Sequence, residues 1–70
     1  MKLNVENLKK LMQEKYNNNY HEFSRQTGVD VTLLHHILTG KRNAGLKTIN
    51  TLISFFKKND LEIKNYISLP

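Results

Sequence analysis

The chain has 70 residues, with 11 Lys and Arg against 6 Asp and Glu, a net charge of +5 and no cysteine. A chain of this length predicts one domain, residues 1–70. Because cysteine is absent, disulfides and thiolate zinc sites are excluded, and the fold must depend on an apolar core or on a partner subunit.

No stretch of the sequence approaches the roughly 20 apolar residues that span a membrane. Residues 1–11 also lack the apolar run and small-residue cleavage site of a secretion signal. We therefore expect a cytoplasmic protein that does not contact membranes.

The isoelectric point of about 9.7 favours a polyanionic partner. Nucleic acid is the commonest such partner for a small basic domain. Many small proteins are basic for other reasons, so charge alone leaves the partner open.

Apolar residues follow a helical period nearly throughout, and the single proline is the last residue. The first predicted helix covers residues 4–16. Three asparagines at 17–19 end it, because asparagine tolerates turn conformations. Asn19 and Glu22 have the spacing of a capping box, which predicts a second helix from about Tyr20.

Gly28 ends the second helix, since glycine readily adopts the left-handed conformation of a helix C-terminus. Val29 is an apolar residue within the turn. Asp30 is a natural N-cap for a third helix at 31–39, and Gly40 follows that helix.

The segment KRNAG at 41–45 is a basic loop, and a fourth helix begins near Leu46. The predicted apolar stripe of the fourth helix consists of Leu46, Ile49, Leu52, Ile53 and Phe56. A fifth short helix is predicted at 63–68, with Leu61 anchoring the loop before it. No segment has the pattern of a strand, so the predicted fold is all-α with five helices.

The third predicted helix has two distinct sides. Its apolar side carries Leu33, Leu34, Ile37 and Leu38. Its opposite side carries Val31, Thr32, His35, His36 and Thr39. Together with the second helix and the turn, it has the layout of a helix-turn-helix at 20–39, in which the second helix of the motif enters the DNA major groove.

Residues 19–67 resemble the helix-turn-helix family of phage Cro proteins and lambda-type repressors, an XRE-like DNA-binding domain of five helices. The resemblance rests on the segment NYHEFSRQTGVDVTLLHHILTGKRN, above all on Gly28, Val29 and the GKRN motif at 40–43. The chain departs from the family at Tyr20, where glutamine is frequent, and at Ser24, where alanine is frequent. It also has NAG where the family has NPS, and it lacks the Gln, Arg or Asn that members often carry on the reading face.

The resemblance implies a lambda-repressor-like domain that binds double-stranded operator DNA. Base-reading positions fall on Val31, Thr32 and His36, whereas His35 is equally suited to a base, a phosphate or solvent. Phosphate contacts are expected from Tyr20, Thr39, Lys41, Arg42 and Asn43.

Each of these residues also has a simpler interpretation. Val31 can pack on a thymine methyl group or fill a gap beside Leu38. Arg42 can bind phosphate or form a structural ion pair. His35 and His36 make a poor metal site, because neighbouring helical residues diverge by about 100°. No catalytic motif is present, so we expect no enzyme activity, cofactor, metal or small-molecule ligand.

The predicted function is that of a sequence-specific, DNA-binding transcriptional regulator, a small Cro-like repressor of a phage or mobile element. Two half-sites about 34 Å apart would require a homodimer on DNA. A possible dimer patch consists of Phe55, Leu61, Tyr66 and Leu69, for which core packing is an equal alternative. A second functional hypothesis is a protein-interaction module of the same fold, similar to an antitoxin or antirepressor.

Overall fold

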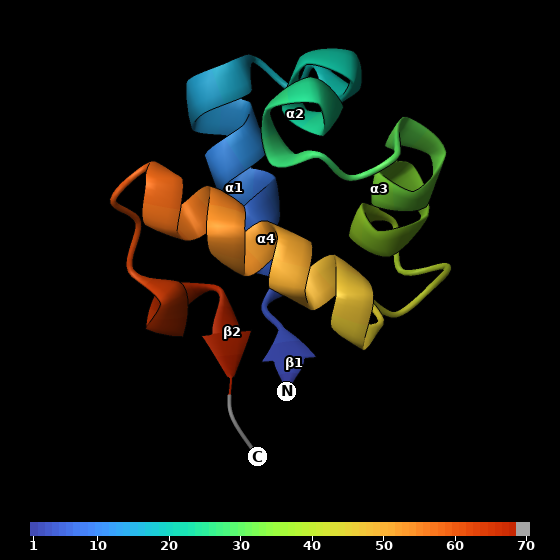
Figure 1. Ribbon diagram of the computed structural model, residues 1–70. Coiled ribbons are helices and arrows are strands. Elements are labelled where there is room, and N and C mark those ends of the chain that lie inside the picture. Colours follow the sequence, from blue (N-terminus) through green and yellow to red (C-terminus); the bar gives the residue numbers. More distant parts are fainter. Residues whose placement is uncertain (69–70) are drawn as a thin grey trace.

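Most of the chain is helical in the computed structural model, which describes residues 1–68 (Figure 1). The α-helices are α1 (Val5–Tyr16), α2 (Tyr20–Thr27), α3 (Val31–Leu38) and α4 (Leu46–Lys58). A short 3-10 helix, η1 (Ile63–Asn65), follows α4. Strands β1 (Lys2–Leu3) and β2 (Ile67–Ser68) pair antiparallel, with Leu3 opposite Ile67. The predicted helical class is therefore confirmed, with a small sheet in addition.

The predicted fifth α-helix and the predicted absence of strands are wrong. Only three residues of the 63–68 segment are helical, and they form the 3-10 helix η1. The segment also bonds to residues near the start of the chain. The Asn4 N–H donates to the Tyr66 carbonyl at 2.7 Å, and the side-chain amide of Asn7 donates to the Asn65 carbonyl at 2.6 Å. These bonds between distant segments satisfy backbone groups that a helix would otherwise pair locally.

Asparagine side chains start the first two helices. The Asn4 side chain accepts from the Asn7 N–H at 3.0 Å, and the Asn19 side chain accepts from the Glu22 N–H at 3.1 Å. The reciprocal half of the predicted capping box is missing, because the Asn19 N–H donates to the Tyr16 carbonyl. The Glu22 carboxylate instead accepts from side chains one turn further along α2.

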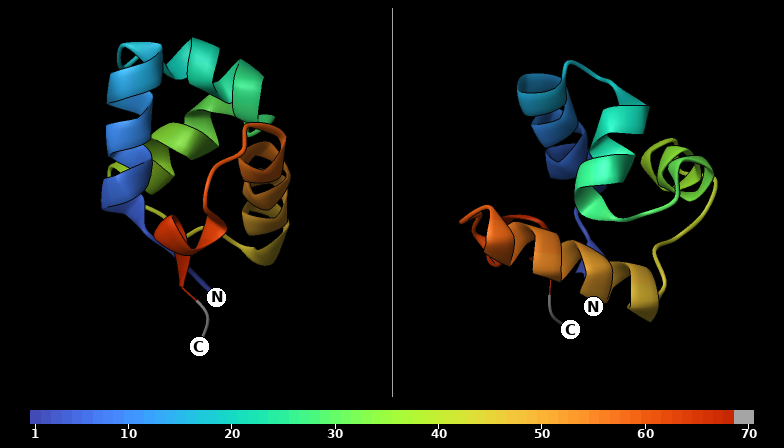
Figure 2. Two further views of the ribbon diagram at one scale, coloured as in Figure 1. Left: turned by 90° about the vertical axis from the view of Figure 1, so that its left-hand side faces the viewer. Right: turned by 45° about the horizontal axis from the view of Figure 1, so that its top comes forward.

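All four α-helices contribute to the core. The largest fully buried side chains are Phe23, Phe56, Leu8, Leu34, Ile37, Leu38 and Leu52. Strands β1 and β2 pair at the end of the molecule opposite α2 (Figures 1 and 2). Helix α2 is therefore at the other end of the protein from the sheet, whereas the end of α3 and the loop after it lie beside β1.

Leu46 of α4 differs from its predicted position, and Phe55 follows one of the two alternatives left open for it. Leu46, predicted to lie on the apolar stripe, is 65% exposed because it is the first residue of the helix and lies beyond the edge of the core. Phe55, considered for a dimer patch, is only 4% exposed and meets Phe23 edge-on at a centroid distance of 5.9 Å. Phe55 is therefore a core residue and is not available on the surface of the folded chain.

Within residues 1–68, no helix combines the length and apolar character that crossing a membrane requires.

Gly28 supports a first prediction, because its φ of +82° is in the left-handed region that side chains with a Cβ rarely adopt. We expect Gly28→Ala to lower the free energy of unfolding by about 1–2 kcal/mol through backbone strain. Gly28→Asn should lower it less, because asparagine visits this region more readily. Urea denaturation of the three proteins measures the difference, and an alanine variant as stable as the parent would contradict this account.

Candidate nucleic-acid interface

The turn between α2 and α3 is three residues long, and side chains of α2 pin it in place. The Ser24 hydroxyl donates to the Val29 carbonyl at 2.5 Å. The Thr27 hydroxyl accepts from the Val29 N–H at 3.2 Å, and the Gly28 N–H donates to the Ser24 carbonyl at 2.9 Å. Val29 itself is 5% exposed. Because the turn is both bonded and buried, α3 has a fixed position relative to α2.

Asp30 then starts α3. One of its carboxylate oxygens accepts from the Thr32 and Leu33 N–H groups at 3.1 and 3.3 Å. The Asp30 carbonyl accepts from the Leu34 N–H at 2.8 Å, which closes the first turn of the helix. Val31 and Thr32 follow this predicted N-cap, so their side chains lie at the N-terminal end of α3, next to the start of α2.

The two predicted faces of α3 are present in the structure. Leu34, Ile37 and Leu38 are buried, and Leu33 is half-buried against the core. The solvent-facing side consists of Val31, Thr32, His35, His36 and Thr39, of which Val31 and His36 are half-buried and the others exposed. Both histidines are therefore outside the core, and we call these five residues the outer face of α3.

Tyr20 extends this face onto α2. Its ring packs against that of His35 at a centroid distance of 5.0 Å, and the His35 and His36 rings are 6.3 Å apart. Beside this pair lies an open groove of about 490 Å³ between the start of α2 and the start of α3. The predicted phosphate residue Tyr20 thus adjoins the predicted base-reading residues.

The basic loop after α3 is attached to the end of the same helix. The N–H groups of Lys41 and Arg42 both donate to the His36 carbonyl, at 2.8 and 3.2 Å. Both side chains are exposed. Backbone bonds therefore place these two cations next to the outer face of α3.

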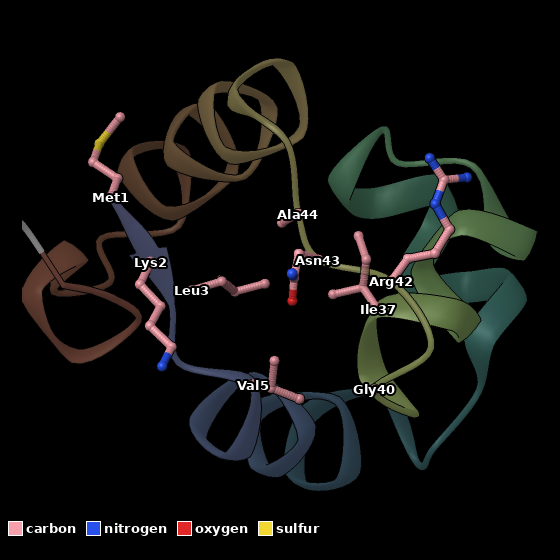
Figure 3. Close-up of a pocket in the computed structure, with 9 residues that line it drawn as sticks. All are labelled: Met1, Lys2, Leu3, Val5, Ile37, Gly40, Arg42, Asn43 and Ala44. Atoms are coloured by element: carbon pink, nitrogen blue, oxygen red, sulfur yellow. The ribbon is translucent and has the colours of Figure 1, made fainter.

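The side chains of Arg42 and its neighbour Asn43 point in different directions (Figure 3). The figure shows a hollow of about 480 Å³ between β1, the start of α1, the end of α3 and the loop. The Arg42 side chain extends away from this hollow, whereas the Asn43 amide points into it, toward Leu3 and Val5. The Arg42 side chain therefore extends into solvent, whereas the Asn43 side chain faces the hollow.

Thr39 is also engaged within the protein. Its hydroxyl donates to the His35 carbonyl at 2.8 Å, at the C-terminal end of α3. A hydroxyl needs its proton to bind a phosphate oxygen. The predicted phosphate contact from Thr39 would therefore require this internal bond to break.

Charge is unevenly distributed along the chain. Between Asp30 and Asp60 there is no acidic residue, and the cations in this stretch are Lys41, Arg42, Lys47, Lys57 and Lys58. The ion pairs among residues 1–68 are Lys9–Glu6 and Arg25–Glu22, so Arg42 has no acidic partner there. The structural ion-pair interpretation of Arg42 therefore finds no support in the described part of the chain.

Glu22, in the first turn of α2, has a carboxyl group with a lowered pKa. Hydrogen bonds donated by the side chains of Gln26 and Arg25 lower the pKa of its carboxyl. The stability from these bonds is present above the ordinary glutamate pKa and is lost as the pH falls through the lowered value. Burial, followed by the negative charge of Glu22, raises the pKa of Tyr16.

Among residues 1–68, no three histidine or acidic side chains gather in a group that could hold a metal ion. His35 and His36 therefore have no third ligand nearby in the described chain.

Sequence reasoning missed the roles of Ser24 and Thr27 in the turn. Ser24 was noted only as a departure from the alanine that is frequent in the family, yet its hydroxyl closes the turn. Thr27 was not singled out, although it is 5% exposed and bonds to Val29. The available signal was the presence of two hydroxyl residues within the four positions before Gly28, a residue type that often bonds to nearby backbone.

Comparison of the chain with models of known protein families, with curated protein sequences and with solved structures gives no match.

The Ser24 bond supports a second prediction. Ser24→Ala should lower the free energy of unfolding by about 1 kcal/mol, because the part-buried Val29 carbonyl loses its donor. Ser54→Ala is the matched control, since the Ser54 hydroxyl bonds to the Asn50 carbonyl at 3.3 Å on the exposed side of α4. Its change should stay within about 0.5 kcal/mol. Equal effects in urea denaturation would show that the turn does not depend on the Ser24 hydroxyl.

Proposed function

We propose that this protein is a sequence-specific, double-stranded DNA-binding transcriptional regulator, a small Cro-like repressor of a phage or mobile element. On this proposal α2, the turn and α3 act as a helix-turn-helix, with α3 in the major groove. The observation that carries it is the continuity of the outer face of α3 with the cations Lys41 and Arg42.

The dimensions of α3 support this proposal. A helix such as α3 measures about 10–12 Å across with its side chains, which is similar to the width of about 12 Å of the B-DNA major groove. One side of the helix is exposed or half-exposed along its whole length, from Val31 to the C-cap residue Thr39. The helix can therefore approach base edges without disturbing the core.

The loop supplies the electrostatic part of the proposal. Lys41 and Arg42 would bind phosphates flanking the groove, and Tyr20 would donate its hydroxyl to a phosphate on the side of α2. Such contacts position a protein on DNA and strengthen binding without reading the sequence. Base selection would then depend on Val31, Thr32 and His36.

Operator recognition would need two copies of the chain on a palindromic site. Of the residues considered for the dimer patch, Leu61 and Tyr66 are half-buried and Phe55 belongs to the core. Leu69 lies outside the described residues. A dimer contact would therefore use Leu61 and Tyr66 rather than Phe55. On this proposal the protein acts in the cytoplasm, catalyses no reaction and needs no cofactor.

Salt dependence tests the phosphate contacts. The logarithm of the affinity for an operator should fall linearly with the logarithm of salt concentration. Arg42→Ala should weaken binding to all DNA sequences alike and reduce this slope by about 1. Lys64→Ala removes the same charge from η1 and is the control, with an unchanged slope expected. Fluorescence anisotropy measures both.

Little DNA affinity at low salt would contradict the proposal and would favour the antitoxin-like or antirepressor-like alternative, in which the main target is a protein.

His36 provides a test of base reading. His36→Ala should relax the preference at one base position, whereas the control Gln13→Ala, on the exposed surface of α1, should leave all preferences unchanged. Selection from random duplexes gives the preferences, and unchanged preferences in His36→Ala would remove this residue from the reading set.

A further inference from the structure

The groove between the starts of α2 and α3 differs in chemistry from the basic loop. It is lined by Asn18, Asn19, Tyr20, His21, Val31, Thr32 and His35, with no acid, lysine or arginine. Its apolar groups come from the Val31 isopropyl group, the Thr32 methyl group and the Tyr20 ring. The groove therefore combines a lining without Lys, Arg, Asp or Glu with a position at the N-terminal end of α3.

His35 closes one side of this groove. Its ring packs against Tyr20 at 5.0 Å with the two planes at 55°, which connects α3 to the first residue of α2. The imidazole thereby forms a wall beside Val31. This contact suits a positioning residue, which holds the shape of the groove, better than a residue that reaches out to a base.

The sequence of α3 restricts how it could read DNA. The helix, VTLLHHIL, contains no Arg, Lys, Asn, Gln, Asp or Glu. Those are the residue types that make the common bidentate or accepting contacts with guanine, adenine and cytosine edges. What remains for discrimination is apolar contact and single hydrogen bonds from hydroxyl or imidazole groups.

We propose that the groove formed by Tyr20, Val31, Thr32 and His35 binds the 5-methyl group of one thymine in each operator half-site. This inference rests on the proposed DNA-binding function and names the base feature that the same surface selects. Among the four bases of DNA, thymine presents an apolar methyl group in the major groove, where the other bases present hydrogen-bonding groups. Val31 and Thr32 provide the contact, and Tyr20 and His35 hold the groove in shape.

The size of the effect follows from the area that one methyl group buries. A buried methyl group contributes about 0.8 kcal/mol, which corresponds to about fourfold in affinity. Because the groove is open, this contact discriminates among bases while leaving most of the affinity to the phosphate contacts.

The experiment begins with an operator selected from random duplexes. Each thymine of that operator is then replaced in turn by deoxyuridine, which lacks only the methyl group. We expect one thymine per half-site to lose about fourfold in affinity by fluorescence anisotropy at fixed salt, and the others to change little.

Protein variants then assign that methyl group to the groove. Val31→Ala should weaken binding to the thymine operator but not to the deoxyuridine operator, so that the two affinities become similar. Thr32→Ser removes the methyl group of that side chain and keeps its hydroxyl. It should also reduce the ratio of the affinity for the thymine operator to that for the deoxyuridine operator. Lys41→Ala is the control and should weaken both duplexes by the same factor.

The positioning role of His35 has its own readout. His35→Ala should reduce the ratio between the thymine and deoxyuridine operators, and His35→Phe should restore it, because phenylalanine keeps a ring against Tyr20. Circular dichroism establishes that each variant is folded, and Val31→Thr, which preserves the shape of the side chain, replaces Val31→Ala if the alanine variant unfolds.

The outcomes separate this inference from the function on which it rests. An operator that binds specifically but tolerates deoxyuridine at every position would overturn the methyl contact and leave the DNA-binding function standing. Equal losses on both duplexes in Val31→Ala would place the methyl group elsewhere and overturn the assignment. If selection enriches no sequence, both the inference and the proposed function are wrong.

Discussion

The short turn from Gly28 to Asp30 is the constraint on which the candidate interface depends. Gly28 turns the chain in the left-handed conformation, Val29 anchors it in the core, and Asp30 starts α3. Ser24 and Thr27 bond to the backbone of Val29 from the preceding helix. Because the turn's polar groups are paired in this way, α3 cannot tilt without breaking several bonds. The positions of Tyr20 beside His35 and of the basic loop beside α3 both follow from this fixed placement.

Local signals made most of the helical structure predictable. Asn19, Gly28 and Asp30 act through their own side chains or backbone angles, so their roles can be inferred from neighbouring sequence. The β1–β2 pair could not be inferred in this way, because each strand has two residues and its partner lies at the other end of the chain. Leu46 was misplaced and Phe55 was left open for a related reason: a helical period gives a stripe, but only the packing of the other helices decides where the core ends.

The candidate interface was predictable to a similar extent. The amphipathic period of α3 correctly placed both histidines on the solvent-facing side. The directions of individual side chains were not accessible, since Arg42 and Asn43 are adjacent in sequence yet point to opposite sides of the loop (Figure 3). The packing of His35 on Tyr20 likewise depends on the crossing of α2 and α3. We propose that the cations of the loop bind phosphates and that the groove, which has no Lys, Arg, Asp or Glu in its lining, contacts a base; this separation of roles follows from these tertiary contacts.

The most direct test of the central claim is a titration of the isotopically labelled protein with its selected operator, followed by amide chemical shifts. The account predicts that the largest changes occur at Tyr20, along the outer face of α3 and at Lys41 and Arg42. Amides of β2 and η1, which do not line the hollow beside Arg42, should change little. Large changes at the sheet with an unaffected α3 would contradict the proposed interface.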